Sequence, residues 1–457
     1  MNLMANQDVV VVGAGFAGLA AGAALSKAGL QVTLLEAGNG TNASFRGELL
    51  HPGGVRALES IGLGEALWGA GSVRIQGFAA FGKPDEPVPL PYDPAAGDGA
   101  GFEHAGLLAA FRSHVGGGKI RLLSHTRAEK LIFERGHVVG VAVDGGDEYR
   151  APLVIAADGR HSKLRKLLGL PTESTLLSYT VAPALDGDLL PLPGTGHVFV
   201  GAPGPILAYP YGHQRVRMVI DIPLGVTHGR ESIAGYVRAH YAAHVPAPLR
   251  EAMITALDRG AFMSSANHAV TTEACAVAGA ALVGDAGGCS HPLTATGMTT
   301  ALHDVTTLVE CLRSYGLTDQ ALVAYQQQRY RFVRAREVFA HSLYDVLRGA
   351  GPGARAMRDG VFHYWRNRER ARRVSMQILT GDDSSPTTFL AEYARVVAIS
   401  GWQTSLGAFR SRKAPETPHP SLAALLATAG SCLDVAVGKA VSTVRLERKR
   451  ALAPLPQ

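Results

Sequence analysis

The chain has 457 residues, of which 47% are hydrophobic and 18% are charged, and its net charge is +6. This length exceeds one ordinary domain, and the composition excludes a disordered chain and gives no support to nucleic-acid binding. The four cysteines form no C-x-x-C pair, which argues against a zinc site or a disulfide framework. No apolar run reaches the roughly 18 to 20 residues of a membrane span. We therefore expect a cytoplasmic protein, free or attached to a membrane surface.

The first 36 residues have the pattern of a strand, a glycine turn, a helix and a second strand. Asp8–Val12 is a β-branched run without alternation, as expected of a strand buried on both faces. A G-x-G-x-x-G turn follows and opens an Ala-rich helix over Leu19–Lys27. Gln31–Leu35 reads as the second strand and ends in Glu36. Together these segments predict a βαβ unit that binds a dinucleotide.

Each residue type in the turn has a physical reason. Gly15 lets the backbone approach a pyrophosphate, and the free N–H groups at the helix start face its charge. Glu36 stands about 20 residues after the turn, where a carboxylate accepts the ribose hydroxyls, and an acid there favours FAD or NAD over NADP. The turn residues that we expect at the pyrophosphate or in its support are Gly13, Gly15, Phe16, Ala17 and Gly18.

Two later segments favour FAD over NAD. The strand Leu153–Ala157 runs into Asp158-Gly159, and the strand within Ala278–Asp285 ends in Gly284-Asp285 before a helix over Thr299–Arg313. An acid at a strand end beside a helix N-terminus suits the ribityl chain and pyrimidine of a flavin, because these need acceptors for their hydroxyl groups and backbone N–H donors. We expect Asp158, Gly159 and Asp285 to contact the cofactor.

The predicted fold is α/β, with a Rossmann-like FAD-binding domain, an inserted antiparallel β-sheet that binds the substrate, and C-terminal helices. Short runs split by Pro and Gly indicate the sheet, and they are Leu176–Pro183, Gly196–Gly201, Pro205–Tyr211 and Arg215–Ile222, with Lys83–Pro94 packed beside them. Helical patterns follow from Thr318 to Gly401 and over Ser421–Lys449. The expected domain boundaries are 1–75, 103–173 and 272–315 for FAD, 76–102 and 174–271 for substrate, and 316–457 for the helices.

The chain resembles the squalene epoxidase family, within the FAD-dependent aromatic-hydroxylase-like flavoprotein monooxygenases. Five segments carry the resemblance, and its most specific part is the HPLT…GMT pattern after Gly284-Asp285-Ala286. The segments are Gly47–Gly54 (GELLHPGG), Ala151–Lys163, Pro205–Pro223, Gly284–Thr299 and Ser342–Leu347.

The resemblance implies an FAD enzyme that passes one atom of O2 through a C4a-hydroperoxyflavin to a lipophilic substrate, most simply epoxidising an isoprenoid or polyene alkene. NAD(P)H or a separate reductase would supply the electrons. Hydroxylation of an aromatic or quinone ring stays open as an alternative, and so does a non-catalytic flavin- and lipid-binding protein. The further cofactor-binding residues that it implies are Arg46, Arg112, Pro292, Gly297 and Met298.

No side chain is required as a nucleophile, so we name only candidates for a catalytic role: His291, Pro292 and Tyr209. Family precedent favours His291-Pro292 as a structural turn over a proton donor. Asp304, in the following helix, is expected on its polar face. The Arg-rich stretch Arg355–Arg373 and the cluster Arg445–Arg450 are interpreted as a solvated helical face, with contact with anionic lipid as the alternative.

Overall fold

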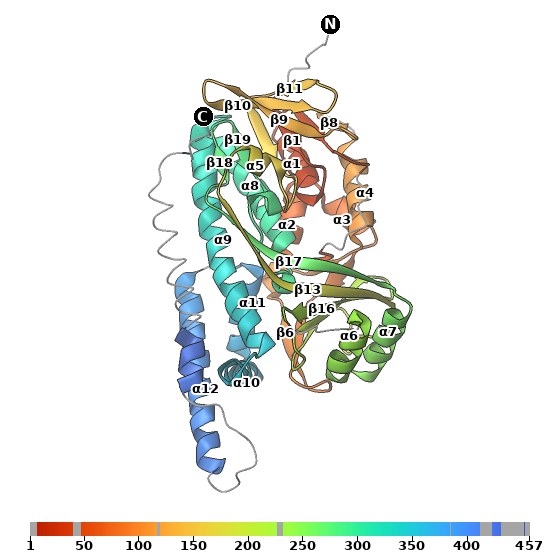
Figure 1. Cartoon of the computed structure of the whole chain (residues 1–457), viewed down its shortest axis with the longest axis vertical. Helices are drawn as coiled ribbons and strands as arrows, with labels where there is room; N and C mark the ends of the chain where they lie inside the picture. Colours follow the sequence, from red (N-terminus) through yellow and green to blue (C-terminus); the bar gives the residue numbers. More distant parts are fainter. Residues whose placement is uncertain are drawn as a thin grey trace.

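The computed structural model describes residues 7–39, 47–116, 119–225, 232–383, 385–411, 423–430 and 452. Figure 1 shows three parts: an α/β region around β1 and α1, a second sheet below it, and a group of helices running along one side. The α/β region is built from segments far apart in the sequence, which is why the chain passes repeatedly between the first two parts.

The α/β region is centred on a six-stranded sheet in the order β18-β19-β12-β1-β2-β8, and the strands from β19 to β8 are parallel. Three central strands are completely buried, which explains their uninterrupted apolar sequences. The strands are β1 (Val9–Val12), β2 (Val32–Leu35), β8 (Ile120–Leu123), β12 (Leu153–Ala156), β18 (Ala276–Val277) and β19 (Ala280–Leu282).

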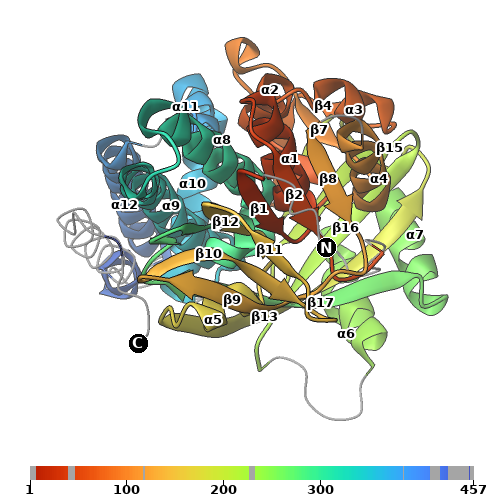
Figure 2. The ribbon, with the colours of Figure 1, turned by 90° about the horizontal axis from the view of Figure 1, so that it is seen from above.

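Helices cover one face of this sheet and a small antiparallel sheet covers the other, as Figure 2 shows. The helices are α1 (Phe16–Lys27), α2 (Pro52–Ser60), α3 (Gly64–Gly69), α4 (His104–Val115) and α8 (Gly297–Tyr315). The small sheet contains β9 (Ala128–Glu134), β10 (His137–Val143) and β11 (Glu148–Arg150). Two short elements flank the region: α5 (Lys163–Leu167) and the sheet of β3 (Leu49–Leu50), β7 (Gly99–Gly101) and β4 (Val73–Ile75).

The second large sheet has seven strands in the order β17-β13-β16-β15-β14-β5-β6. Every run predicted for the inserted sheet contributes a strand to it. All neighbours are antiparallel except β14 and β5, which come from separate parts of the chain and pair in parallel. The strands are β5 (Gly77–Phe81), β6 (Pro87–Pro91), β13 (Thr172–Asp186), β14 (Gly196–Phe199), β15 (Ile206–Gly212), β16 (Arg215–Pro223) and β17 (Phe262–Thr272). Two helices that the sequence patterns did not predict, α6 (Ile233–Tyr241) and α7 (Ala247–Asp258), pack against one face.

The other face of the seven-stranded sheet packs against the C-terminal helices. These are α9 (Asp319–Arg348), α10 (Pro352–Asn367), α11 (Glu369–Thr380) and α12 (Pro386–Ser411), followed by a helix over 423–430. The breaks near Gly349 and Pro386 were predicted, but the break at Arg368 was not. Arg445–Arg450 and most of Ser421–Lys449 lie outside the described residues. Among the helices that the structure describes, none combines the length and the apolar character needed to cross a membrane.

Candidate active site

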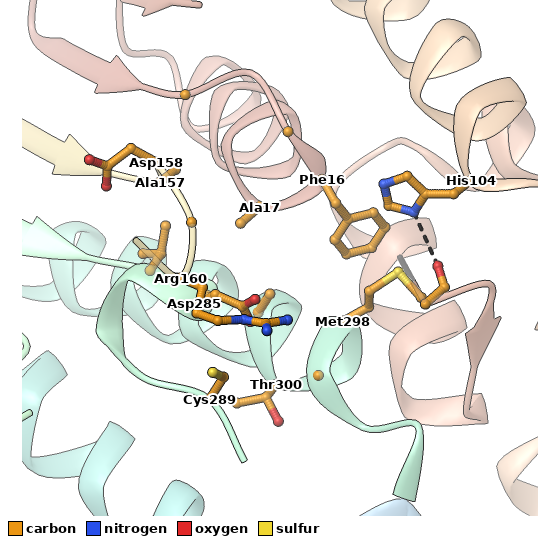
Figure 3. A pocket seen from close by; sticks show the side chains of 18 of the residues that line it. Phe16, Ala17, His104, Ala157, Asp158, Arg160, Asp285, Cys289, Met298 and Thr300 are labelled. Carbon is orange, nitrogen blue, oxygen red and sulfur yellow. Dashed lines mark hydrogen bonds between the residues drawn. The ribbon is translucent and has the colours of Figure 1, made fainter. Parts of the chain in front are cut away.

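A cavity of about 810 Å³ lies where the carboxyl ends of β1, β2 and β12 meet the start of α8 (Figure 3). This is the edge at which open α/β sheets bind their ligands. Gly18 does not line the cavity, and Arg46 lies outside the described residues. The predicted site residues that line it are Gly13, Gly15, Phe16, Ala17, Glu36, Arg112, Asp158, Gly159, Tyr209, Asp285, His291, Pro292, Gly297 and Met298.

The glycine turn has the geometry that its residues require. Gly13 has a φ of +102°, and a Cβ there would lie 2.5 Å from the carbonyl oxygen of Ala157. A Cβ at Gly18 would lie 1.7 Å from the Gly13 oxygen, so this glycine serves helix–strand packing. A Cβ at Gly15 would meet nothing within 4 Å, because that position faces the cavity. The turn therefore leaves room for a pyrophosphate at the start of α1.

Glu36 and Arg112 brace this turn from two sides. The Glu36 carboxylate accepts hydrogen bonds from Ala14 N at 2.8 Å and Gly38 N at 3.0 Å. The Arg112 guanidinium donates to the Ala14 oxygen at 3.0 Å. Because each carboxylate oxygen has two lone pairs, Glu36 keeps acceptor capacity toward the cavity. Its contact with a ribose stays a prediction.

At the opposite end, a buried ion pair supports the Gly284-Asp285 turn. Asp304 Oδ2 accepts from Gly284 N at 2.9 Å, and Asp304 Oδ1 lies 2.9 Å from Arg329 Nε. Both side chains are at most 2% exposed. The expectation that Asp304 lies on a polar helix face is therefore wrong, because α9 covers that side of α8 and supplies the counter-charge.

His291 belongs to a buried polar network. Its Nδ1 accepts from Leu293 N at 3.1 Å, so its hydrogen lies on Nε2, which faces Ser178 Oγ at 3.0 Å and Asp221 Oδ1 at 3.2 Å. Tyr344 OH donates to Asp221 Oδ2 at 2.8 Å, and its ring stacks on His291 with centroids 4.1 Å apart. The network ties the loop 291–298 to β13, β16 and α9. Both ring nitrogens of His291 are thus engaged in holding the loop.

A second histidine fixes the same loop from the other side. His51 Nε2 lies 2.9 Å from the Thr294 carbonyl oxygen, and His51 Nδ1 lies 2.8 Å from Tyr92 OH. Complete burial lowers the pKa of His51 to about 4, so the ring is neutral. It therefore donates to Thr294 and accepts from Tyr92. Sequence reasoning placed this residue in a motif but saw neither partner.

A bidentate ion pair that the sequence patterns did not predict lies beside the cavity. Arg217 Nε and Nη2 donate to the two carboxylate oxygens of Glu48 at 2.6 Å and 3.1 Å, and both side chains are 5% exposed. Arg217 also lies 4.6 Å from the centre of the Tyr211 ring. Tyr209, on the same strand β15, is 2% exposed, and burial raises the pKa of its hydroxyl. The ion pair joins the α/β region to the seven-stranded sheet.

Comparison with known proteins identifies the family. The squalene epoxidase family model matches residues 150–416, and the FAD dependent oxidoreductase model matches residues 8–75. The chain belongs to the squalene epoxidase family. It is 32% identical over 381 residues to squalene epoxidase 3 of Arabidopsis thaliana, covering 78% of this chain and 71% of that protein. It is 28% identical to the squalene epoxidase of Schizosaccharomyces pombe, covering 88% of this chain and 92% of that one.

The match to one relative covers less than two thirds of that protein's length. Squalene epoxidase 2 of Arabidopsis thaliana is 33% identical, and the matched part spans 64% of its length. Among solved structures, Klebsiella pneumoniae HpxO complexed with FAD and uric acid has a TM-score of 0.69 at 21% identity, covering 85% of this chain and 100% of that one. P. aeruginosa PqsL in complex with 2-aminobenzoylacetate has a TM-score of 0.65 at 23% identity, covering 75% and 97%. These likenesses confirm the predicted fold class.

FAD is the cofactor of this squalene epoxidase family member, and the residues present fit it. Gly15 leaves the approach to α1 open, and Glu36 stands at the end of β2. In the cavity wall, Asp158 Oδ1 is buried and has no hydrogen-bond partner among the described residues. Its other oxygen accepts from Lys163 N and Leu164 N at the start of α5. A ligand with hydroxyl donors satisfies such an acceptor.

Proposed function

We propose that this chain is an FAD-dependent monooxygenase that inserts one atom of O2 into a lipophilic substrate, with an isoprenoid or polyene alkene as target and an epoxide as product. One observation carries the proposal: a second, apolar cavity adjoins the FAD cavity. The two cavities share Leu207, and Leu293 and Thr294 of the loop 291–298 line the second. The relatives named squalene epoxidase support the same reaction.

The second cavity has a volume of about 140 Å³ and lies between the seven-stranded sheet and helices α9 to α12. Phe78 and Leu90 line it from the sheet, and Met357 and Trp365 line it from α10. Its one charged side chain among the described lining residues, Glu392, accepts a hydrogen bond from Tyr364 OH at 2.7 Å. Such walls favour an uncharged hydrocarbon skeleton.

The chain's own residues position the reaction. Bound FAD, once reduced, supplies the chemistry that activates O2. The apolar walls hold the alkene and exclude water from the reacting edge. His51 and His291 hold the loop 291–298 from two sides, so that its backbone keeps one position relative to both cavities. The reaction needs no protein nucleophile.

The test is product analysis with FAD-loaded protein, squalene, and NADPH with or without a flavoprotein reductase. An epoxide, heavier than the substrate by one oxygen atom and lacking one alkene, supports the proposal. A phenol formed from an aromatic substrate in a parallel reaction, with no epoxide, supports the ring hydroxylase instead. A flavin-containing protein that consumes no O2 with any substrate is a carrier. Turnover with NADPH alone, or only with reductase, identifies the electron source.

We further propose that the C-terminal helices rest on a membrane surface. Arg355, Arg366 and Arg370 are exposed on α10 and α11, and α12 exposes 68% of Trp402. The helix over 423–430 exposes 56% of Leu426. Figure 1 shows α10 and α12 at the same end of the molecule. Exposed basic residues beside an exposed tryptophan are suited to anionic lipid headgroups and their acyl boundary.

Vesicle sedimentation tests the contact. Binding to vesicles of phosphatidylcholine with phosphatidylserine should exceed binding to pure phosphatidylcholine, and Trp402→Ala should weaken it several-fold. Tyr315→Ala, at an exposed position on α8, is the matched control and should change nothing. Equal binding of wild type and Trp402→Ala to both vesicles would show that the helices carry an ordinary solvated face.

A further inference from the structure

The loop 291–298 contains a backbone conformation that its residue does not favour. Ala295 has a φ of +51° and a ψ of +27°, in the left-handed region that glycine adopts without cost. Three other described residues that are not glycine have a positive φ, namely His125, Arg135 and Gln214. All three lie in exposed bends or turns, whereas Ala295 is half-buried at the wall of the FAD cavity. A strained residue beside a site is a candidate for a functional role.

Hydrogen bonds on both sides of Ala295 hold this conformation. Ala295 N donates to the Pro292 carbonyl oxygen at 2.9 Å. The preceding carbonyl, that of Thr294, accepts from His51 Nε2 at 2.9 Å, and the hydroxyls of Thr294 and Thr296 are 2.9 Å apart. Glycine would make the same backbone bonds without the unfavourable contact of a Cβ. What alanine adds at this position is therefore its methyl group alone.

The methyl group lies where the two cavities meet. Ala295 lines the FAD cavity, and its side chain packs against the apolar cluster that contains Leu207 and Trp365. Trp365 lines the second cavity, and Leu207 lines both. The neighbours of Ala295 in the loop divide in the same way, since Pro292 lines the FAD cavity and Leu293 lines the second. An alanine side chain is a single methyl, so the contact with the cluster is made by the methyl itself.

The sheet supplies apolar surface to the same junction. Leu207 of β15 is paired with Val219 of β16. Val219 also lines the FAD cavity and packs against the cluster to which Leu207 belongs. Polar groups are close on the loop side, because the hydroxyls of Thr294 and Thr296 flank Ala295 in the chain. A water that entered there would find the polar partners that it needs.

We propose that the Ala295 methyl group closes the junction between the FAD cavity and the substrate cavity to water. The inference rests on the proposed function and assigns a residue to the exclusion of water that the reaction requires. A water occupies about 30 Å³, close to the volume of a methyl group, so loss of the methyl makes room for one. In productive turnover one oxygen atom of O2 enters the alkene and the other leaves as water. With water at the junction, O2 takes two electrons and two protons and leaves as H2O2.

The visible absorption band of bound FAD tests the inference without turnover. Its fine structure is sharp in apolar surroundings and becomes smooth when water reaches the flavin. FAD-loaded Ala295→Gly should therefore show a smoother band than wild type. Gln214→Gly is the matched control, because it relieves the same backbone conformation at an exposed turn that lines neither cavity. Its spectrum should equal that of wild type.

Turnover with squalene, NADPH and O2 gives a second readout. The share of NADPH electrons recovered as H2O2 should rise several-fold in Ala295→Gly and stay unchanged in Gln214→Gly. Adding Val219→Ile to Ala295→Gly returns one methyl group to the sheet side of the junction and should recover most of the loss. A double variant that behaves like Ala295→Gly would attribute the loss to a more mobile loop and overturn the inference.

Thermal unfolding separates the proposed role from a role in holding the fold. Both glycine variants should unfold at the wild-type temperature or up to about 2 °C above it, because glycine adopts a positive φ at lower cost. Clearly lower unfolding of Ala295→Gly, or a variant with the wild-type spectrum and the wild-type share of H2O2, would overturn the inference. If wild type forms no epoxide, the proposed function fails, and the FAD spectrum still decides the role of Ala295.

Discussion

Two carboxylates stand at opposite ends of the FAD cavity, and their surroundings differ. The Glu36 carboxylate faces the cavity and also accepts hydrogen bonds from the backbone N–H groups of Ala14 and Gly38, so it holds the glycine turn in place. Asp285 lies in the short turn at Gly284–Gly287, which Asp304 and Arg329 hold in place from the protein interior. We propose that this rigid support makes Asp285 the better-placed partner for the flavin end of FAD.

We predict that both acids contribute to FAD retention and that Asp285 contributes more. Glu36→Ala should weaken FAD binding about tenfold, and Asp285→Ala about a hundredfold, because a hydrogen bond to a charged group contributes about 1.5 to 3 kcal/mol. Visible flavin absorbance after gel filtration and a titration of the apoprotein measure the effect. Asp147→Ala, in an exposed turn, serves as the control. An Asp285→Ala protein that stays fully yellow and active would contradict the assignment.

At the level of elements, the α/β region and the seven-stranded sheet are joined by the Glu48–Arg217 pair. Glu48 precedes β3, and Arg217 lies near the start of β16. The charged groups of Glu48 and Arg217 are both buried away from water, so each depends on the other for its stabilisation. The exposed pair of Arg215 and Glu103 bridges the same two regions at 2.9 Å, with side chains 39% and 50% exposed.

Removing one partner of the buried pair should therefore be costly. Arg217→Met should lower the free energy of unfolding by about 3 to 5 kcal/mol, because Glu48 stays buried without its counter-charge. The double variant Glu48→Leu/Arg217→Met should recover most of this loss. Arg215→Met, the exposed control, should cost less than about 1 kcal/mol. Urea unfolding measures all three variants. Equal losses of unfolding free energy in Arg217→Met and Arg215→Met would refute the stabilising role of the Glu48–Arg217 pair.

Across the described part of the molecule, three histidines in separate regions are held in the neutral form; two of them are fully buried and His303 is half-buried. His51 lies beside the loop 291–298, and His197 lies in β14. His303 lies in α8, where its ring stacks on Phe332 with centroids 3.6 Å apart. Burial lowers the pKa of each to about 4. In the unfolded chain these rings titrate near pH 6.5.

The folded protein should consequently lose stability on acidification. Below about pH 6.5 these histidines bind protons in the unfolded chain but stay neutral in the folded protein. The free energy of unfolding therefore falls as pH decreases, and it continues to fall until about pH 4. A fully buried histidine contributes up to about 3 kcal/mol over this range. Urea unfolding at about pH 7 and about pH 5 measures the slope. His51→Gln should flatten it, whereas exposed His137→Gln should not; identical slopes would contradict the prediction.

The sequence by itself determined the local architecture. The runs of β1, β2 and β12, the glycine turn, and the period of α9 depend on neighbouring residues, since strand and helix periodicity and turn geometry are properties of short segments. Gly13 could be assigned to a tight turn because only glycine adopts a positive φ easily. The spaced motifs from Gly47 to Met298 were enough to indicate the family and its cofactor.

Tertiary structure alone decided which distant groups meet. Glu48 and Arg217 are 169 residues apart in the chain, and nothing near either residue predicts the other. Asp304 was misplaced on a polar face because a helix pattern does not reveal a second helix that covers it and supplies Arg329. Burial and counter-charge are properties of three-dimensional packing, so the energetics of this site follow from the fold rather than from any one segment.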